Sequence, residues 1–325
     1  MPTLAIVSNH SPNMAAEQNT DRNRFLCDYP HTIHVFNSLA FAYLNEDKCD
    51  ELRLLDFKDH KPRMGIILGR RGGLLCSPFS APFGGFVFAE TDTSLEITDR
   101  AVKSLVRYAD LHQLSIRIKL PPSFYHPQLV AKQTFCLLAN GFRQLYCDVN
   151  YHFDLHAFVD YTSILWRNAR KNLQRAMREP FVFKRAETED DIIAAYTTIQ
   201  LNRQAKGYPL RMSLQQVLDT IEVIPADFFN LSMNGANVAA AQVFHVAHDV
   251  VQVIYWGDVP GFENYRPMNF LAAKIVEYYK QAGLRYVDVG PSSEFGVPSI
   301  GLCNFKESIG CRVEDKYSFE YNHKP

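Results

Sequence analysis

Apolar and polar positions follow the clearest pattern in the second half of the chain. Alternation of apolar and polar residues predicts strands over 181–185, 228–233, 238–247, 250–256, 285–289 and 315–321. Helical spacing predicts helices over 163–178, 190–206, 213–223 and 267–282. Asn234-Gly235 predicts a tight hairpin between the second and third of these strands. After the first helix, the expected order is strand, two helices, three antiparallel strands, helix, strand, a segment of loop or helix, and a last strand.

The first half shows a weaker version of the same order. Strands are expected over 52–57, 64–68, 74–77 and 115–120, and helices over 36–44 and 95–111. Residues 78–85 contain too much proline and glycine for regular structure. Residues 1–24 are polar and irregular, and we expect them to form a mobile segment. The similar element order in the two halves indicates two related domains, at 25–160 and 161–325, with the possibility that 315–321 completes the first domain.

Composition agrees with a globular protein of this size. The chain has 325 residues, 47% hydrophobic and 21% charged, which allows two domains with substantial cores. The net charge of -1 implies no bulk attraction to nucleic acid or to an anionic membrane, and no DNA partner is expected. The seven cysteines are scattered without a Cys-x-x-Cys pair, which favours a reducing, cytoplasmic location. No apolar run reaches the length of a membrane span.

One stretch near the C-terminus concentrates candidate chemistry. Gly301–Arg312 places Lys306 between Phe305 and Glu307, and it follows a strand that leads into Asp288–Glu294. Polar residues at strand ends are where α/β proteins usually place their chemistry. A cation in such a position can stabilise an oxyanion that develops during a reaction, and a nearby carboxylate can accept a proton. Lys306 is a candidate for the oxyanion contact, with a surface ion pair as the alternative.

Three carboxylates are candidates for the proton acceptor. They are Asp258, at the end of an apolar strand, Asp288, and Glu294, in the loop after the last core strand. Each could equally cap a helix or accept hydrogen bonds from loop amides. Water could also accept the proton, so the identity of the base stays open.

Two basic features are candidates for binding phosphate. The helix over 163–178 carries a cationic stripe made by Arg167, Arg170, Lys171, Arg175 and Arg178. It suits a nucleotide-linked precursor, the pyrophosphate of coenzyme A or tRNA, and a solvated helix face is the alternative reading. Arg266, just before a helix that begins with Pro267, could bind an anion together with the helix N-terminus.

Four stretches together resemble the FemAB-like branch of the GNAT superfamily of N-acyltransferases. They are Ser77–Phe86, Trp166–Ala176, the strand–helix–strand set of Tyr255–Asp258, Arg266–Leu271 and Tyr286–Gly290, and Phe305–Gly310. The resemblance spans about residues 70–312. It implies an α/β (α+β) chain with two GNAT-like domains, each a mixed, mostly antiparallel central sheet flanked by helices. It also implies an N-acyltransferase that acts on a small-molecule or peptide amine.

The resemblance further implies roles for particular residues. The lysine of the terminal Phe-Lys signature would act at the transferred acyl group, with Phe305, Asn304 and Ser292 at the substrate. Phe83 would line an acceptor groove between the domains, and Arg167, Arg170 and Lys171 would also bind substrate. The cofactor would be held by Arg266, Asn269 and Tyr255.

The acyl donor is the least determined feature. Acetyl-CoA-dependent members of the superfamily carry a glycine-rich turn at the start of the helix after the central strand, whereas this chain has Asn264–Asn269 there without glycine. Acyl-CoA, such as acetyl-CoA, is the preferred donor, with aminoacyl-tRNA as the alternative and tRNA a partner only in that case. A module that binds a phosphorylated ligand without catalysis is a third hypothesis. No metal is expected, because three pairs of histidines close in sequence lack a third ligand, namely His31/His34, His152/His156 and His245/His248. The oligomeric state is open.

Overall fold

The computed structural model describes residues 14–324, which divide into two compact units. Unit 1 comprises the residues up to Pro121, His126–Leu145 and the residues from Ser318 onward. Unit 2 comprises Pro122–Tyr125 and Tyr146–Tyr317. The boundary at Leu145/Tyr146 lies earlier than the expected one at 160/161, and both units are discontinuous in sequence.

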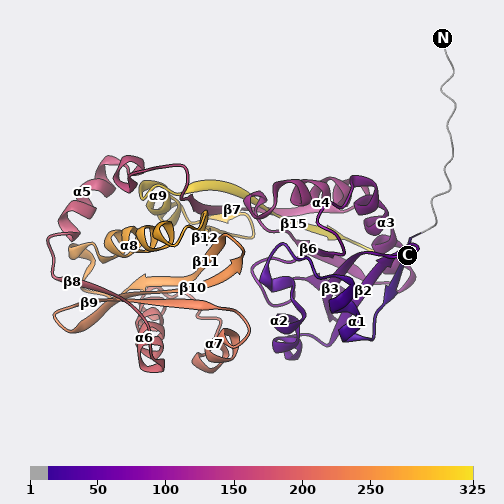
Figure 1. Ribbon diagram of the computed structural model, residues 1–325, viewed down its shortest axis with the longest axis horizontal. Coiled ribbons are helices and arrows are strands. Elements are labelled where there is room, and N and C mark those ends of the chain that lie inside the picture. Colours follow the sequence, from indigo (N-terminus) through magenta and orange to yellow (C-terminus); the bar gives the residue numbers. More distant parts are fainter. Residues whose placement is uncertain (1–13, 325) are drawn as a thin grey trace, which may run out of the picture. The chain divides into compact units, whose positions relative to one another are not determined.

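Unit 1 is a mixed sheet with helices on both faces. Its strand order is β1-β2-β3-β4-β6-β15, with β5 paired to β3. The strands are β1 (Ala15–Gln18), β2 (Glu51–Lys58), β3 (Pro62–Arg71), β4 (Leu74–Ser77), β5 (Phe86–Phe88), β6 (Ser115–Lys119) and the end of β15 (Arg312–Tyr321). The helices are α1 (Arg22–Asp28), α2 (Leu39–Leu44), α3 (Leu95–Leu111) and α4 (Pro127–Ala139). Figure 1 shows α3 and α4 over one face of this sheet and α1 and α2 on the other.

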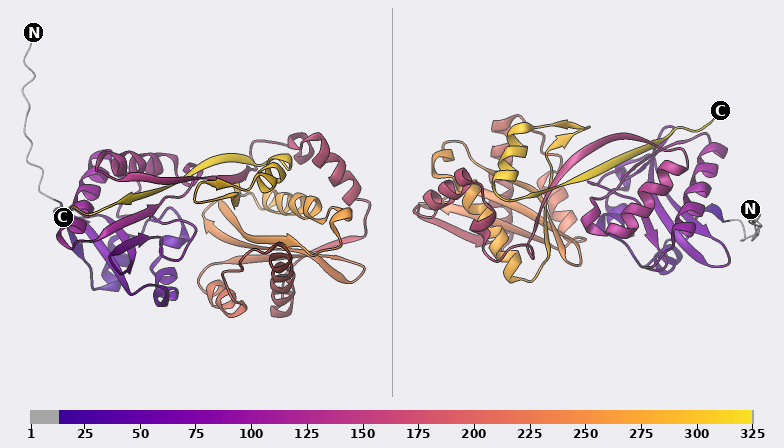
Figure 2. Two further views of the ribbon diagram at one scale, coloured as in Figure 1. Left: turned by 180° about the vertical axis from the view of Figure 1, so that it is seen from behind. Right: turned by 90° about the horizontal axis from the view of Figure 1, so that it is seen from above.

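Unit 2 has the same kind of architecture. Its strand order is β7-β12-β11-β10-β9-β8, and only β11 and β12 pair in parallel. The strands are β7 (Arg143–Asp154), β8 (Phe181–Arg185), β9 (Ala226–Met233), β10 (Ala236–Ala247), β11 (Val250–Asp258) and β12 (Tyr286–Pro291), with a small hairpin of β13 (Ser293–Glu294) and β14 (Val297–Pro298). The helices are α5 (Arg167–Ala176), α6 (Glu189–Lys206), α7 (Leu214–Ile221), α8 (Pro267–Gln281) and α9 (Ile300–Ser308). Figure 2 shows α6 and α7 on one face of the sheet and α5, α8 and α9 on the other.

Each unit contains one edge strand that follows, in the sequence, the last helix of the other unit. β7 follows α4 of unit 1, and its residues from Tyr146 onward belong to unit 2, where Asp154 pairs with Tyr286 of β12. β15 follows α9 of unit 2, and in unit 1 its Ser318 and Tyr321 pair with Lys119 and Ile116 of β6. The last strand therefore ends in the first unit, which is one of the two possibilities left open by the sequence.

Several segments differ from the sequence-based expectation. The strand β1 lies within the predicted mobile segment 1–24, because Ala15–Gln18 pair with β2 and Met14 is buried. Residues 1–13 of that prediction lie outside the described residues. The elements that were not predicted include α1, β5, α4, β7 and the hairpin of β13 and β14. Of these, α4 begins with a proline at its first turn, as helices often do. The undecided segment before the last strand contains the helix α9.

The C-terminal end of α6 lies against the end of β11. A capping box of Thr188 and Asp191 begins this helix, and Gly207 in the left-handed conformation ends it. Asn202 Nδ2 donates a hydrogen bond to the carbonyl oxygen of Asp258, and a side chain at Gly257 would overlap with Asn202. The helix therefore packs closely on β11 only because that strand carries glycine there.

A buried carboxylate connects β8, β9, β10 and α8. Asp227 accepts hydrogen bonds from Arg185 Nε at 2.5 Å, His245 Nε2 at 2.7 Å and Tyr279 Oη at 2.9 Å. Burial alone would raise the pKa of Asp227, but the hydrogen bonds from His245, Arg185 and Tyr279 outweigh burial and lower that pKa to about 2. The network thus favours the ionised carboxylate.

We expect Asp227→Asn to lower the free energy of unfolding by about 2 kcal/mol at pH 6. The substitution removes the buried carboxylate that accepts hydrogen bonds from Arg185 and His245. The pKa is lower in the folded state than the ordinary value of 3.8, so this stabilisation is complete above pH 4 and is lost as the pH falls toward 2. Urea denaturation at pH 6 and pH 2.5 measures both effects, with the exposed Asp219→Asn as control. Equal losses at the two pH values would contradict the assignment.

Candidate functional site

The two parallel strands of unit 2 separate after three residue pairs. β11 and β12 pair from Val250 with Tyr286 to Gln252 with Asp288. Beyond this point, within the described residues, β11 continues to Asp258 paired only with β10, and β12 continues to Pro291 paired only with β7. The two strands therefore no longer pair toward their carboxyl ends, the edge at which open α/β sheets bind ligands, and this region between them is called the opening below.

The edge of β11 in this opening contains a β-bulge. Val243 of β10 pairs with Val253, but Gln242 pairs with Tyr255, so Ile254 is an extra residue on β11. Backbone N–H groups that point from this part of β11 toward β12 have no strand partner. Such N–H groups are suited to bind a carbonyl oxygen on which negative charge develops.

Lys306 of α9 is buried beside the end of β12. Its Nζ donates hydrogen bonds to the carbonyl oxygens of Val289, Gly290 and Pro291, at 3.0, 2.9 and 3.1 Å. Burial is the main cause that lowers the pKa of Lys306, to about 8. An ammonium has three N–H donors, so in this structure the three backbone carbonyls use all of them. Its contact with a developing oxyanion stays a prediction.

Asp288 is the buried carboxylate of β12. Its Oδ1 accepts hydrogen bonds from Asn150 Nδ2 at 2.7 Å and Gly290 N at 2.8 Å. Its Oδ2 accepts from Tyr125 Oη and Gln252 Nε2, both at 2.8 Å. The side chain has no exposed surface. Both oxygens are therefore fully used, and Asp288 organises the strands β7, β11 and β12 around the base of the opening.

Arg203 of α6 was not predicted as a site residue. Its guanidinium lies 5.0 Å from the ring centroid of Tyr255 and 5.9 Å from that of Tyr208. Its positive charge also contributes to lowering the pKa of Lys306. Burial lowers the pKa of Arg203, and the buried Nε has no hydrogen-bond partner among residues 14–324. No ion pair to Arg203 is found within that range. A half-buried guanidinium without a counter-ion is suited to bind an anionic group.

The two remaining candidate bases form hydrogen bonds and ion pairs with residues other than Lys306. Asp258, mostly buried at the end of β11, accepts a hydrogen bond from Asn202 Nδ2 at 3.3 Å and lies 3.5 Å from Lys206 Nζ. Glu294 is exposed at the hairpin and forms a 2.9 Å ion pair with the exposed Arg211. Both carboxylates are already bound by side chains, and their roles as proton acceptors stay predictions.

The predicted cofactor residues lie at the start of α8 and on β11. Arg266 adopts a left-handed conformation (φ 62°) as the N-cap of α8, and its buried Nε has no hydrogen-bond partner in the described chain. Asn269 in the first turn of α8 is buried. Tyr255 adjoins the bulge, and its Oη accepts a hydrogen bond from Arg211 N. The sequence thus placed these residues on the two elements that border the opening.

The predicted substrate-binding residues have different surroundings. Asn304 is exposed on α9, Ser292 is buried, and Phe305 packs on the core with its ring 6.2 Å from that of Trp256. The prediction for Phe83 is corrected by the structure, because this side chain has no exposed surface and packs against His34 and Phe36 in the interior of unit 1. A residue enclosed in this way supports the fold of the Pro/Gly-rich loop and does not contact a substrate.

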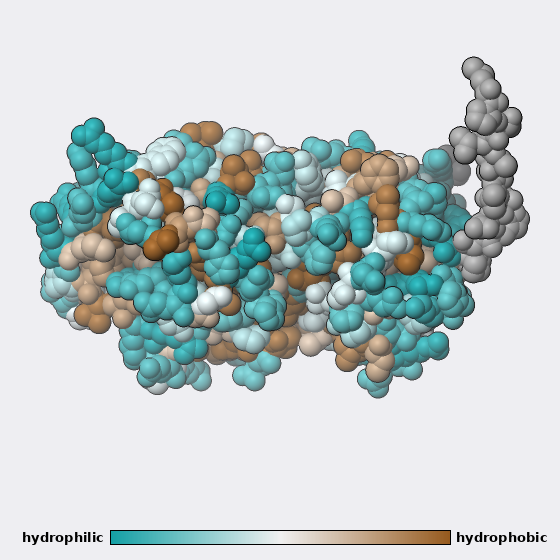
Figure 3. Space-filling view, turned by 45° about the horizontal axis from the view of Figure 1, so that its top comes forward, coloured by the Kyte–Doolittle hydropathy of each residue, from teal (hydrophilic) through white to brown (hydrophobic). Residues whose placement is uncertain are grey.

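The basic stripe on α5 is exposed. Arg167 and Lys171 are exposed and form no ion pair within residues 14–324, whereas Arg170 donates hydrogen bonds to the carbonyl oxygens of Thr162 and Leu165. Arg170 therefore stabilises the turn before α5. Figure 3 shows hydrophilic residues over the end of unit 2 that carries this helix.

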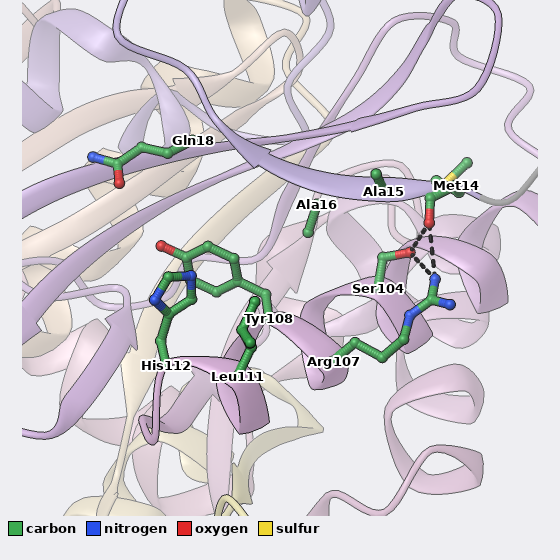
Figure 4. Close-up of a pocket in the computed structure, with 9 residues that line it drawn as sticks. All are labelled: Met14, Ala15, Ala16, Gln18, Ser104, Arg107, Tyr108, Leu111 and His112. Atoms are coloured by element: carbon green, nitrogen blue, oxygen red, sulfur yellow. Dashed lines mark hydrogen bonds between the residues drawn. The ribbon is translucent and has the colours of Figure 1, made fainter.

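A pocket of about 460 Å³ lies in unit 1, between β1 and α3. Arg107 and Ser104 in its lining donate hydrogen bonds to the carbonyl oxygen of Met14, and the ring of Tyr108 lies beside His112 (Figure 4). None of the residues predicted for catalysis or binding lines it. Among residues 14–324 no group of three or more His, Cys, Asp or Glu side chains could hold a metal ion, and no helix is long and apolar enough to cross a membrane.

Comparison with known proteins identifies the fold. No protein-family model and no curated protein matches the sequence. The structure is similar to that of FemX, with a TM-score of 0.64 and 11% identity over 94% of this chain and 97% of that chain. It is also similar to L-PGS from Bacillus licheniformis (TM-score 0.58, 14% identity, 93% and 91% covered) and to a tandem GNAT protein from the clavulanic acid biosynthesis pathway (TM-score 0.52, 12% identity, 85% and 84% covered). The chain therefore has a FemAB-like tandem GNAT fold, as the sequence resemblance implies.

Proposed function

We propose that unit 2 is an N-acyltransferase that moves an acyl group from acyl-CoA to an amine. The observation that carries this proposal is the opening between β11 and β12, with its bulge at Ile254. An acyl donor that lies in the opening can present its carbonyl oxygen to the unpaired N–H groups of β11. The tandem GNAT fold supports the same reaction class, although a fold by itself does not establish an activity.

The reaction would proceed by direct attack. The lone pair of the neutral amine forms a bond to the thioester carbonyl carbon, and the negative charge on the oxygen is stabilised by N–H groups of β11. The carbon–sulfur bond then breaks and the thiolate of coenzyme A leaves. The amine gives up one proton, which Asp258, Glu294 or water accepts and the thiolate finally takes.

The pyrophosphate of the donor would bind at the N-terminus of α8. This helix has 15 residues, and the N–H groups of its first turn favour an anion. Arg266 adds a guanidinium whose Nε has no partner within the described chain. Its strained left-handed backbone is compatible with a functional position. Pro267 removes one N–H donor, so Arg266 would contribute more to anion binding here than in a glycine-rich turn.

Arg203 would bind an anionic group of one substrate. We expect Arg203→Gln to raise the KM of that substrate at least tenfold, because a charge-assisted hydrogen bond contributes about 1.5–3 kcal/mol. The free energy of unfolding should fall little, since no ion pair is lost. Steady-state kinetics and thermal melting measure both quantities, and the exposed Arg24→Gln on α1 serves as control. A large loss of stability without a change in KM would assign Arg203 to the fold instead.

Aminoacyl-tRNA is the second candidate donor, and the exposed basic residues of α5 favour it. Arg167, Lys171, Arg175 and Arg178 form no ion pair within residues 14–324, so they can contact a phosphate backbone. Under this reading the ester oxygen of the tRNA, not a thiol, is the leaving group.

Release of thiol from a panel of acyl-CoAs with mixed amines tests the proposal. We expect amine-dependent thiol release and an acylated amine of the matching mass. No thiol release, together with no thermal shift on addition of CoA, would exclude acyl-CoA as the donor. Amine-dependent deacylation of aminoacyl-tRNA would then support the second candidate, and inactivity with both donors would favour a module that only binds a phosphorylated ligand.

A further inference from the structure

Buried amide side chains gather on one face of the unit 2 sheet, around Asp288. Gln252 of β11 is directly opposite Asp288, and Asn150 of β7 lies two residues from His152, the other strand partner of Asp288. Side chains two residues apart, or directly opposite on neighbouring strands, share a face. Gln242 of β10 lies on the same face, diagonal to Gln252. The three amides are at most 1% exposed.

The oxygen atoms of these amides lack hydrogen-bond donors. Asn150 Nδ2 and Gln252 Nε2 both donate to Asp288, which fixes the orientation of each amide because only its NH2 end can donate to a carboxylate oxygen. Asn150 Oδ1 and Gln252 Oε1 are therefore acceptors, and neither has a partner among residues 14–324. Gln242 has no partner for either of its side-chain polar atoms. Each such group costs about 1–3 kcal/mol when it stays unpaired.

We propose that this amide cluster, Asn150, Gln242 and Gln252 around Asp288, binds a primary amino group. The cluster presents several acceptors beside a carboxylate, and a primary ammonium supplies three N–H donors. A hydroxyl group supplies one donor only, and an anion would meet the carboxylate and the amide oxygens. Burial lowers the pKa of His152 on the same face, which favours its uncharged form. Lys306 approaches β12 from α9, and its three N–H groups are bound to backbone carbonyls.

Gln242 can turn toward the ligand. Because its side chain forms no hydrogen bond in the described chain, its movement breaks none. The ligand would then pair the oxygens of Asn150, Gln252 and Gln242, which repays the cost of their burial.

The cluster begins where β11 and β12 separate, so the bound amino group belongs to a substrate of the opening. This identification of the amino compound as the acyl acceptor, or as the aminoacyl part of a donor, rests on the proposed function. The binding site itself does not, because it can be measured without any acyl donor.

Binding of n-butylammonium, with n-butanol as the uncharged isostere, tests the proposal on the full chain. Glutamine labelled with 15N reports the side-chain signals of Gln242 and Gln252. We expect the ammonium probe to shift these two signals with saturation and to raise the melting temperature, and the alcohol to do neither. Gln242→Met, which keeps all four donors to Asp288, should weaken binding at least tenfold, and the exposed Gln215→Leu on α7 should leave it unchanged. Equal responses to both probes, or unaltered binding to Gln242→Met, would overturn the proposal.

A stability measurement without ligand adds an independent arm. If Gln242 is unpaired until a ligand binds, Gln242→Met should raise the melting temperature by about 2–4 °C, because it removes a buried unsatisfied amide. A lower melting temperature would show that Gln242 is satisfied in the free protein and would overturn the inference. Probe binding without any acyl transfer would refute the proposed function alone. Acylation of amines with an unchanged KM for the amine in Gln242→Met would refute the inference alone.

Discussion

Substitution of Lys306 by methionine is expected to lower acyl transfer at least tenfold and to destabilise unit 2. Three backbone carbonyls, those of Val289, Gly290 and Pro291, lose their donor together. Each unsatisfied buried carbonyl costs about 1–3 kcal/mol, less whatever water can restore. The end of β12 would then shift relative to β11, and the opening would lose the geometry that positions the donor carbonyl.

Steady-state rates and chemical denaturation of Lys306→Met measure the two effects. The half-buried Lys274→Met on α8, which loses an ion pair with Glu277 and a cation–π contact with Phe270, is the matched control. Rates should be compared well below the melting temperature of each variant, so that both are folded. An unchanged rate would refute any contribution of Lys306 to activity, and an unchanged free energy of unfolding would refute its role in holding β12.

Truncation after Tyr317 is expected to unfold unit 1, although it removes only the last eight residues. Ser318–Tyr321 form the strand that pairs with β6, and Phe319 and Tyr321 are buried in unit 1. Glu320 in the same segment accepts hydrogen bonds from Arg117 at 2.8 Å and Arg143 at 2.6 Å. Loss of one buried aromatic side chain costs about 3–5 kcal/mol, so the truncation removes a large part of a typical stability of about 5–15 kcal/mol.

Near-ultraviolet circular dichroism and calorimetry of the truncated chain measure this effect. Truncation after Tyr321 is the matched control, because it keeps all the pairs between β15 and β6. We expect the control to melt close to the full chain. If the shorter truncation also melts like the full chain, the exchange of edge strands contributes little to the stability of unit 1.

Local patterns in the sequence were sufficient to predict most helices and strands of unit 2. Asn234 and Gly235 adopt the positive φ values that a tight hairpin requires, and Pro267 and Gly283 mark the two ends of α8 as expected. The strand β7 escaped detection because its first residues are polar and half exposed, and the exchange of β7 and β15 depends on pairings that no local pattern encodes.

The contacts of the candidate site could not be predicted from the sequence. The Phe305-Lys306 signature singled out Lys306, but its hydrogen bonds to three carbonyls at the end of β12 depend on how the chain folds. The family resemblance assigned Phe83 to a groove, whereas the packing of His34 and Phe36 around it encloses the ring. Arg203 and the amide cluster come from elements far apart in sequence, so only the folded chain identifies them.

A crystal structure with bound coenzyme A is the most direct test of the central claim, that the opening between β11 and β12 holds the acyl donor. The account predicts the pyrophosphate at the N-terminus of α8 beside Arg266, and the sulfur atom within the opening close to Ile254. Coenzyme A bound elsewhere on the protein, with the opening empty, would contradict it.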